Sequence, residues 1–365
     1  MPAIMRLLSW RFRARVAAAG VSRRQRCCGQ NAPTKVCRDT PSVNRAEREI
    51  PGIWARWKRA IPLCGTVVLC ATLVACKSAA PTATDRHASV PDAFSFVATC
   101  DMRSYVGPAP AGQRYFDGVC AAIQAVGAGA FMISPGDCDP PGPVRATVDR
   151  YLGTNYVWYP VMGNHELGNK TNLLWLRDWA RAGIPHLTRR GPPGAEDTTF
   201  SFEFGNSHFI ALNAYYDGQS DAVRSDNIPD ATFNWLEQDL AATRKPLIWV
   251  VGHIPIQSLP DMDTGRLRHA GESLSKDPAR LERFVELLRR YRVRAYLCGH
   301  THCCSVARVK GVWQADAGHA RGAGDKGAPS SFLKFRISGE RAWVDIYRGD
   351  TNGVAYQLRK TVELD

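Results

Sequence analysis

The chain after residue 90 alternates between short apolar runs and longer segments in which apolar residues recur every three or four positions. The runs predict buried strands, and the wider spacing predicts helices. The predicted strands cover 94–98, 130–133, 156–162, 199–204, 208–212, 247–251, 295–298, 332–337 and 342–347, and the predicted helices cover 113–126, 173–182, 233–242, the region around 281–288 and one segment before 156. The first three strands alternate with helices, which indicates a βαβαβ unit with a parallel sheet. Gly205-Asn206 predicts a hairpin that starts a second sheet, so the fold class is α/β.

Most of these strands end at a polar residue that core packing does not require. The polar residues are Asp101, Asp137, Asn164 with His165, His253, and His300 with His302. Ligand sites of open α/β sheets lie at the carboxyl ends of the strands, so these side chains are expected to meet there. A glycine precedes most of them, which lets the backbone turn sharply and lets a neighbouring strand end come close. An extended backbone at His300-Thr301-His302 would point both rings to one side.

Carboxylate and amide oxygens together with three imidazoles form a mixed ligand set. Such a set suits zinc, manganese or iron better than calcium, which prefers oxygen ligands alone. Each element taken singly has an ordinary structural explanation, since Gly-His after a strand is more often a histidine satisfied within the core and Gly-Asp is more often a turn. Five such elements after predicted strands favour a metal site.

In the order of its motifs, the chain resembles the calcineurin-like metallophosphoesterase family, including its purple acid phosphatase branch. The motifs are Asp101, Gly136-Asp137, Gly163-Asn164-His165-Glu166, Gly252-His253 and Gly299-His300-Thr301-His302, and the resemblance spans about 94–318. The amino-acid sequence at 202–206 also resembles the purple acid branch. The resemblance implies a four-layer sandwich of two mixed β-sheets flanked by helices. It also implies a metal-dependent hydrolase that acts on phosphate mono- or diesters.

The family's ligand pattern implies two metal ions, each manganese, iron or zinc. Carried over by position, it makes Asp137 the bridging ligand, Asp101 and His302 ligands of the first ion, and Asn164, His253 and His300 ligands of the second. A hydroxide formed between the ions would attack phosphorus in line with the leaving group. His165 would protonate the leaving oxygen or stabilise the charge that develops there, and Glu166 would orient His165.

The chain departs from the family at the first metal site. Arg103 stands where most members have a histidine ligand, and a guanidinium does not coordinate a cation. Pro140 stands where the purple acid branch has a tyrosine. Three alternatives remain open, namely a weak first metal, completion of the site by Asp139, and a single-metal site. Arg103 is either a catalytic residue that holds the substrate phosphate or a salt-bridged surface residue beside Asp101.

The N-terminal part of the chain differs in composition from the rest. Residues 1–76 hold 14 of the 47 Lys and Arg residues but only 3 of the 34 Asp and Glu residues, which leaves 33 basic and 31 acidic residues for the remainder. The remainder is therefore nearly neutral and carries no nucleic-acid-binding signal.

An apolar run ends in Leu73-Val74-Ala75-Cys76, which resembles a bacterial lipobox. We therefore expect a basic segment at 1–59 that is disordered or an over-extended start, a signal-like segment at 60–76, a linker at 77–90 and a metallophosphoesterase domain at 91–365. Lipidation of Cys76 would attach the protein to a membrane on the periplasmic side of the bacterial cell envelope. A short anchoring or buried helix is the alternative reading of 60–76.

The sequence leaves open the state of the cysteines, the role of His319, the specificity loops and the class of function. Cys100, Cys120, Cys138, Cys298, Cys303 and Cys304 are either disulfide-bonded or buried thiols. His319 either lines the pocket or is a structural loop histidine, and loops at 191–196 and 215–230 are candidates for substrate specificity. The alternatives to a phosphoesterase are a non-catalytic envelope protein on the same fold, which binds phosphate or a partner after losing the first metal site, and a metallohydrolase of another ester.

Overall fold

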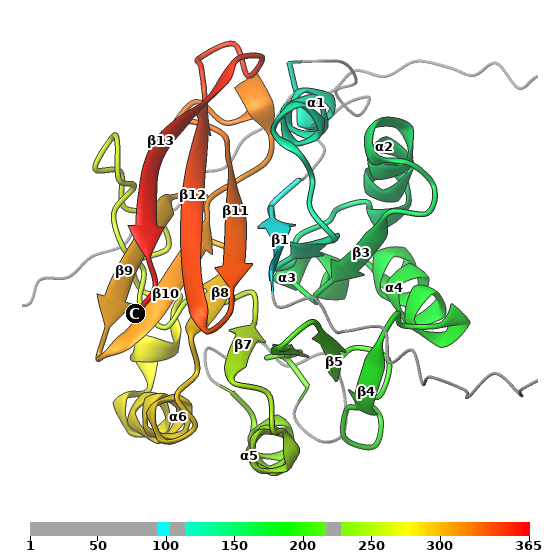
Figure 1. The fold of residues 1–365 in the computed structure, drawn as a ribbon, viewed down its shortest axis with the longest axis vertical. Helices are drawn as coiled ribbons and strands as arrows, with labels where there is room; N and C mark the ends of the chain where they lie inside the picture. The colour runs from blue at the N-terminus through cyan, green and yellow to red at the C-terminus, as the bar shows by residue number, and fades with distance from the viewer. Residues whose placement is uncertain (1–92, 103–113, 217–227) are drawn as a thin grey trace, which may run out of the picture. The chain divides into compact units, whose positions relative to one another are not determined.

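The computed structural model of the chain describes residues 93–102, 114–216 and 228–365 (Figure 1). The segments expected at 1–59, 60–76 and 77–90, together with Cys76 and Arg103, lie outside these residues, as does most of the expected loop at 215–230. Within the described ranges, no helix is long and apolar enough to cross a membrane.

The described residues form two mixed sheets. The first has the strand order β13-β12-β11-β1-β2-β3 and the second has the order β4-β5-β6-β7-β8-β10-β9. The strands of the first sheet are β1 (Ala93–Ala98), β2 (Phe131–Ser134), β3 (Val157–Pro160), β11 (Ser331–Ser338), β12 (Arg341–Gly349) and β13 (Tyr356–Glu363). Those of the second are β4 (Leu187–Arg190), β5 (Phe200–Phe204), β6 (Ser207–Ala211), β7 (Leu247–Val251), β8 (Ala295–Cys298), β9 (Cys304–Val309) and β10 (Val312–Ala317).

Helices cover the outer faces of both sheets (Figure 1). They are α1 (Phe116–Val126), α2 (Pro141–Leu152), α3 (Asn164–Leu167), α4 (Lys170–Ala182), α5 (Asp230–Ala242) and α6 (Pro278–Arg290), with short 3₁₀ turns η1 (Leu274–Lys276) and η2 (Gly322–Gly324). Side chains of α1 and α2 pack with Val97 and Met132 of the first sheet, whereas those of α5 and α6 pack with Ile210 and Val250 of the second. The predicted fold class, two mixed sheets flanked by helices, is confirmed.

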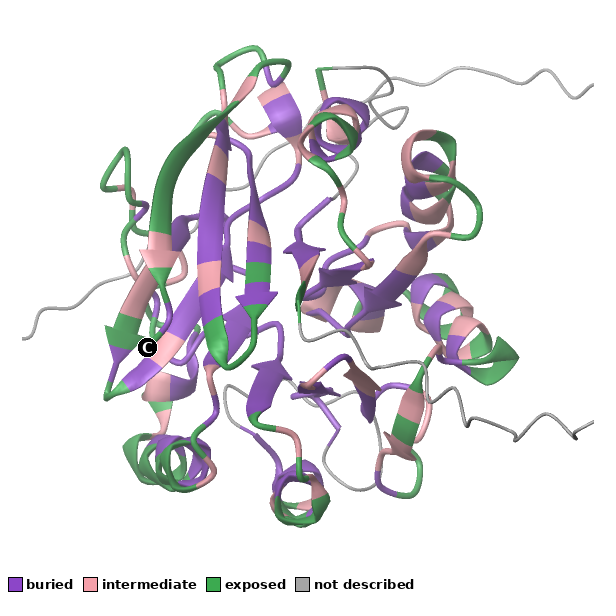
Figure 2. Cartoon of the chain, in the orientation of Figure 1, coloured by how far each residue is buried: buried purple, intermediate pink, exposed green. Residues whose placement is uncertain are grey.

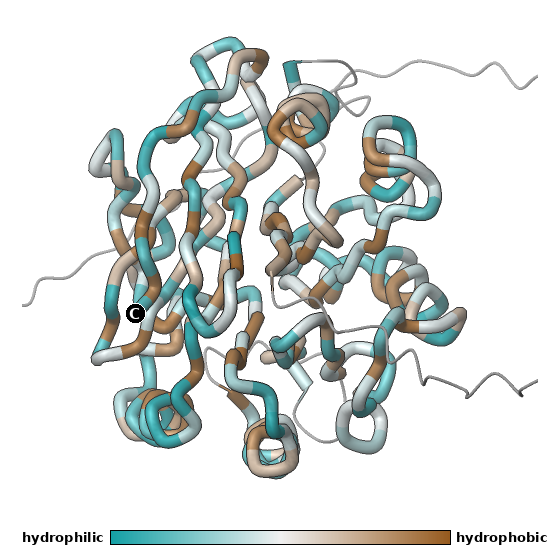
Figure 3. Tube along the Cα trace, viewed as in Figure 1, coloured by the Kyte–Doolittle hydropathy of each residue, from teal (hydrophilic) through white to brown (hydrophobic). Residues whose placement is uncertain are grey.

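An aromatic layer fills the space between the sheets. The ring of Phe96 stacks on that of Phe335 with centroids 4.7 Å apart, and meets Phe209 and Trp249 of the second sheet edge-on at 5.2 and 5.5 Å. Successive residues of a strand point to opposite faces, so Phe96 enters this layer while Val97 faces the helices. Both faces of the central strands are thus buried, which explains their continuous apolar sequence (Figures 2 and 3).

The first three strands are parallel, as the predicted βαβαβ unit requires. β1, β2 and β3 run parallel in one sheet, and β6, β7 and β8 run parallel in the other. The hairpin at Gly205-Asn206 joins β5 to β6, as predicted. The predicted ranges do not include β4, β9, β10 or β13. β4, β9 and β13 lie at the edges of the sheets, whereas β10 lies between β8 and β9.

Candidate metal centre

The carboxyl ends of strands from both sheets meet at one place. The backbone N–H of Asp101, which follows β1, donates to the carbonyl of Gly136 at 3.2 Å after β2. The N–H of His300, which follows β8, donates to Oδ2 of Asp101 at 3.0 Å. The N–H of Gly299 donates to the carbonyl of His253 at 3.0 Å. These bonds join the polar strand ends of the two sheets into one site.

Two imidazoles, an amide and a carboxylate converge on the position expected for the second metal. Oδ1 of Asn164 lies 3.1 Å from Nε2 of His253 and 3.1 Å from Nδ1 of His300. Oδ1 of Asp137 lies 3.4 Å from Nε2 of His253. Asp137, His253 and His300 are buried. The structure therefore brings together the four residues that the sequence pointed to for this position.

The first position is built by Asp101 and His302 beside the second. Nε2 of His302 lies 3.2 Å from Oδ1 of Asp101, and both side chains are buried. Ligand atoms of Asp101, Asp137 and His253 lie within 4.8 Å of one another, so Asp137 stands between the two groups. The described ranges thus supply two carboxylates and one imidazole at the first position.

The hydrogen bonds of His253 provide a test of whether these residues suit a metal. Nδ1 of His253 lies 2.7 Å from the carbonyl oxygen of Pro135, which can only accept, so Nδ1 carries the proton. Nε2 of the neutral ring is then an acceptor, and it faces the acceptor oxygens of Asn164 and Asp137. A cation among these atoms would turn a repulsive arrangement into coordination. The residues therefore fit an ion that takes nitrogen and oxygen ligands.

The outer nitrogen of His302 has the same kind of partner. Its Nδ1 lies 2.7 Å from Oδ2 of Asp325, and guanidinium nitrogens of Arg268 and Arg321 also lie against Nδ1. Arg266 and Arg268 lie 2.9 and 3.5 Å from the same carboxylate. A histidine that binds metal usually donates its other ring N–H to such an acceptor, which fixes its tautomer and orientation. Asp325 was not predicted, because it lies in a loop without periodicity and no motif surrounds it.

Burial and neighbouring charges shift the pKa values of the ligands. Burial lowers the pKa of His300 to about 2, so its ring is neutral and has a lone pair for a cation. Burial also lowers the pKa of His302, but the opposing effect of the charge and hydrogen bond of Asp101 is larger, so the net shift of this pKa is upward. Burial raises the pKa of Asp137, as it does that of any carboxyl removed from water. An ion at the first position would therefore compete with a proton on His302.

Four of the candidate ligands have an unusual backbone conformation. The φ angles are 55° at Asp101, 57° at Asp137, 73° at His300 and 57° at His302. A non-glycine residue in this region is strained by about 1–3 kcal/mol, and such residues cluster at functional sites. The expectation of an extended backbone at 300–302 is wrong, because both histidines adopt the left-handed region.

Two glycines are needed because a ligand passes close to their backbone. A Cβ at Gly163 would lie 2.4 Å from both the backbone nitrogen and Oδ1 of Asp137. A Cβ at Gly299 would lie 2.6 Å from Oδ2 of Asp101. Each glycine thus makes room for the ligand that follows the neighbouring strand, as the sequence predicted.

His165 lies at the edge of the site and contacts two carboxylates. Its Nε2 is 3.7 Å from Oδ2 of Asp137, and its Nδ1 is 3.6 Å from Oδ2 of Asp139. The other oxygen of Asp139 accepts from Nδ2 of Asn172 at 2.7 Å. Asp139, which the sequence offered as a further ligand for the first metal, thus contacts His165 and Asn172.

Glu166 is buried beneath the site. Its Oε2 accepts from the backbone N–H of Gly163 at 2.7 Å and of Asp137 at 3.1 Å. Burial and the charge of Asp137 raise the pKa of its carboxyl. These two bonds hold the backbone of two strand ends, and Asp139 lies beside the ring of His165.

The six cysteines of the described ranges are free and buried. Burial raises the pKa of every one of these thiols, which favours the protonated form. Of the two open alternatives, the structure shows buried thiols rather than disulfides.

His319 has both ring nitrogens bound to the backbone. Nε2 lies 2.9 Å from the carbonyl of Ala328, and Nδ1 accepts from the N–H of Arg321 at 3.2 Å. The residue is fully buried. His319 is therefore a structural histidine of the loop before β11.

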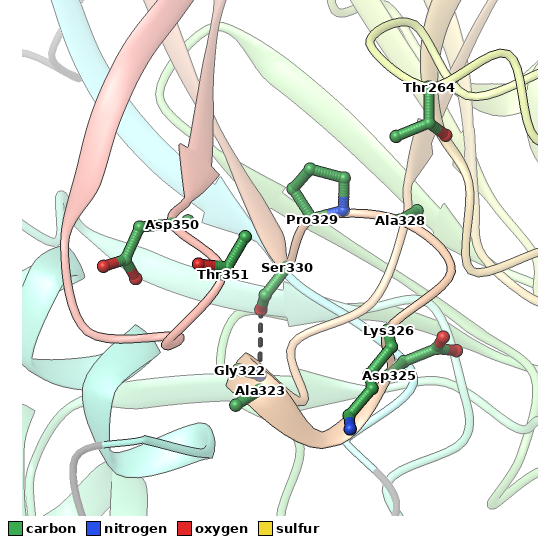
Figure 4. A pocket seen from close by; sticks show the side chains of 11 residues that line it. Thr264, Gly322, Ala323, Asp325, Lys326, Ala328, Pro329, Ser330, Asp350 and Thr351 are labelled. Atoms are coloured by element: carbon green, nitrogen blue, oxygen red, sulfur yellow. Dashed lines mark hydrogen bonds between the residues drawn. The ribbon is translucent and has the colours of Figure 1, made fainter.

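A cavity of about 520 Å³ lies beside this loop (Figure 4). Its lining includes Asp325, Lys326, Ser330 and Asp350, and Oγ of Ser330 accepts from the N–H of Gly322 at 3.0 Å. Asp325 thus belongs both to the wall of the cavity and to the surroundings of His302.

Comparison with known proteins agrees with this geometry. Residues 112–304 match the family model described as calcineurin-like phosphoesterase. Tartrate-resistant acid phosphatase type 5 of Rattus norvegicus is 28% identical over 165 residues, which cover 42% of this chain and 45% of that protein. The Mus musculus protein of the same name is 27% identical over 160 residues, with the same shares. The chain therefore spans less than half the length of these curated relatives.

A solved structure of PhoD matches with a TM-score of 0.51 and 13% sequence identity, covering 75% of this chain and 70% of that chain. At this identity the likeness is one of fold.

The lowered pKa of His319 predicts a pH dependence of stability. Burial lowers this pKa to about 4, whereas the unfolded chain titrates near 6.5. Between these values the unfolded state binds a proton that the folded state does not, so the free energy of unfolding falls as pH drops from about 6.5 to about 4. His319→Gln keeps a donor and an acceptor and should remove about 3 kcal/mol of this dependence. Urea unfolding of metal-free protein across this range measures it.

His186→Asn is the control, because His186 is an exposed histidine. Its pH dependence should match that of the wild type. Equal pH dependence in the wild type and His319→Gln would contradict the assignment of a buried neutral ring.

Proposed function

Because this chain belongs to the calcineurin-like phosphoesterase family, a family of metal-dependent hydrolases of phosphate esters, we propose that it hydrolyses phosphate mono- or diesters with two metal ions. The observation that carries this proposal is the convergence of acceptor atoms around Oδ1 of Asn164, with Nε2 of His253 and Nδ1 of His300 each at 3.1 Å. A cation at this position would be coordinated by all three of these atoms.

The proposed ligands divide into two sets that share Asp137. Asp101 and His302 hold the first ion, and Asn164, His253 and His300 hold the second. Nitrogen and oxygen donors of this kind suit manganese, iron or zinc. The bound ions would supply positive charge to the phosphoryl oxygens and lower the pKa of water near the phosphorus.

His165 is the proposed proton donor to the leaving oxygen. Its side chain is 30% exposed, so a substrate can reach it at the edge of the buried site. Asp139 faces Nδ1 and attracts the proton on that nitrogen, which directs Nε2 toward the reacting group. Glu166 supports the reaction indirectly, because its bonds to Gly163 and Asp137 fix the strand ends.

We further propose that the site is of the purple acid phosphatase type. The tartrate-resistant relatives support this branch, although each matches 42% of the chain. Pro140 stands in place of the tyrosine of that branch, so the first ion would lack a phenolate ligand. The contacts of Asp139 with His165 and Asn172 favour a weakly held first ion over completion of the site by Asp139.

Replacing a ligand of the second ion tests the metal centre. Purified protein should contain manganese, iron or zinc by elemental analysis and should hydrolyse a generic aryl phosphate. Asn164→Ala and His300→Ala should each lower the bound metal and reduce kcat by at least about 100-fold. Cys120→Ala, in the helix layer, should retain both properties, because Cys120 packs with apolar residues of the first sheet.

Equal losses in all three variants would contradict the assignment of the site. Wild-type protein that lacks metal and turnover would favour the alternative of a non-catalytic phosphate- or partner-binding protein.

The role of His165 predicts a dependence on the leaving group. His165→Asn should reduce kcat by about 10²–10⁴-fold for an alkyl phosphate, whose leaving oxygen needs a proton, and far less for p-nitrophenyl phosphate. Asp139→Asn should show a smaller loss with the same preference, because it acts through His165. Steady-state kinetics with both esters measures this, and losses of the same size for both would contradict proton donation by His165.

We also propose that the protein acts on the periplasmic side of the bacterial cell envelope, attached through Cys76. The support is the sequence Leu73-Val74-Ala75-Cys76 after an apolar run. Radiolabelled palmitate should enter the wild-type chain expressed in bacteria and should be absent from Cys76→Ser. Labelling of both chains would reject lipidation at Cys76.

A further inference from the structure

We propose that Glu272 is a positioning residue that fixes the ring of His300 for the second metal ion. This inference rests on the metal centre proposed above. Oε2 of Glu272 lies 3.3 Å from Nε2 of His300, while the other ring nitrogen of His300 faces Asn164. Glu272 thus occupies the side of the ring that points away from the other ligands.

The segment before η1 holds Glu272 in this place. Nδ1 of His269 lies 2.9 Å from Oε2 of Glu272, and the rings of His269 and His300 are tilted with centroids 4.5 Å apart. The N–H of Glu272 donates to the carbonyl of His269 at 2.9 Å, and Oγ of Ser258 donates to the same carbonyl at 2.7 Å. His269 and a closed backbone turn therefore restrict the carboxylate.

A neutral imidazole carries one N–H proton, either on Nδ1 or on Nε2. If the proton is on Nδ1 of His300, no lone pair faces Asn164 and the ring cannot serve as a ligand. A carboxylate at Nε2 stabilises the other tautomer, in which Nε2 carries the proton and Nδ1 has the lone pair. Glu272 therefore selects the form of His300 that the second ion needs.

The other two histidines of the centre follow the same rule. Nδ1 of His253 faces the carbonyl of Pro135 at 2.7 Å, and Nδ1 of His302 faces Asp325 at 2.7 Å. With Glu272, each of the three imidazoles has an acceptor beside its outer nitrogen, and at His302 the guanidinium of Arg268 lies against the same nitrogen. Glu272 differs in exposure, since 55% of its side chain is exposed, against 10% for Asp325. Water competes for its bond, so its effect is expected at the low end of the range for such partners.

The alternative role for His269, Glu272 and His300 is to bind a separate metal ion. Ligand atoms of His269, Glu272 and His300 lie within 4.8 Å of one another. An ion there would need the lone pair of Nε2 of His300, whereas the ring binds the second ion through Nδ1 and keeps its proton on Nε2. The two uses exclude each other in a neutral ring, and the contact of Nδ1 with Asn164 favours the positioning role.

Metal-binding measurements with four proteins test this role. Wild type, Glu272→Ala, Glu272→Gln and Glu286→Ala are freed of metal with a chelator and dialysed against zinc buffers of graded free concentration, and the bound zinc is counted by elemental analysis. Glu286 is the matched control, because it is a glutamate on the exposed face of α6 with 67% of its side chain exposed. Thermal unfolding in metal-free buffer verifies that all four proteins fold alike.

In Glu272→Ala, one of the two wild-type zinc ions should need about tenfold more free zinc, while the other ion should be unaffected. Glu272→Gln keeps an acceptor oxygen and should recover most of the lost affinity. Glu286→Ala should match the wild type. Recovery by glutamine separates positioning of His300 from a general loss of charge.

Three results would overturn the proposal. Zinc binding by Glu272→Ala that equals that of Glu286→Ala would reject the role of Glu272 alone. A third zinc ion in the wild type that disappears in Glu272→Ala would assign the cluster to a separate ion site. Wild-type protein that retains no zinc or manganese would overturn the metal centre, and the role of Glu272 with it.

Discussion

One hydrogen bond, from the N–H of His300 to Oδ2 of Asp101, joins the end of a strand in one sheet to the end of a strand in the other. It forms inside the protein between a backbone donor and a carboxylate, a charge-assisted bond that is stronger than a neutral one. The bond uses one oxygen of Asp101 and leaves the other directed at His302. Both proposed metal positions depend on it, because His300 serves the second and Asp101 serves the first.

The backbone conformation and close packing of the site fix the positions of the proposed ligands without an ion. Four ligands adopt positive φ angles, and two glycines allow the neighbouring ligands to pass at distances that a Cβ would prevent. Such strain persists only when the surrounding structure over-determines it. The aromatic layer around Phe96 supplies that support, because it fixes the spacing of the two sheets behind the strand ends. Packing in the core thus holds the strand ends, and the residues that follow them, at fixed positions.

The parts of the fold and site that could be predicted are those with a local signal. A glycine followed by a polar residue after an apolar run placed Asp137, Asn164, His253 and His300, and parallel strands brought these ends together. Other features had no such signal. Asp325 and Glu272 lie in loops without periodicity, and their contacts with His302 and His300 depend on tertiary structure. The left-handed backbone of His300 and His302 also could not be derived from residue types that usually avoid it.

The segment between β7 and η1 begins with a proposed ligand, His253, and later carries Arg266, Arg268 and Glu272 to the outer sides of His302 and His300. Buried Asp261 ties its middle to the rest of the chain, since Oδ2 accepts from the N–H of Cys304 at 3.0 Å and from Arg348 at 2.5 Å. The proposed ligands follow strand ends, whereas Glu272, the outer partner of His300, stands on this anchored loop. A substitution at Glu272 would therefore change the surroundings of the His300 ring without changing the strand ends that carry the proposed ligands.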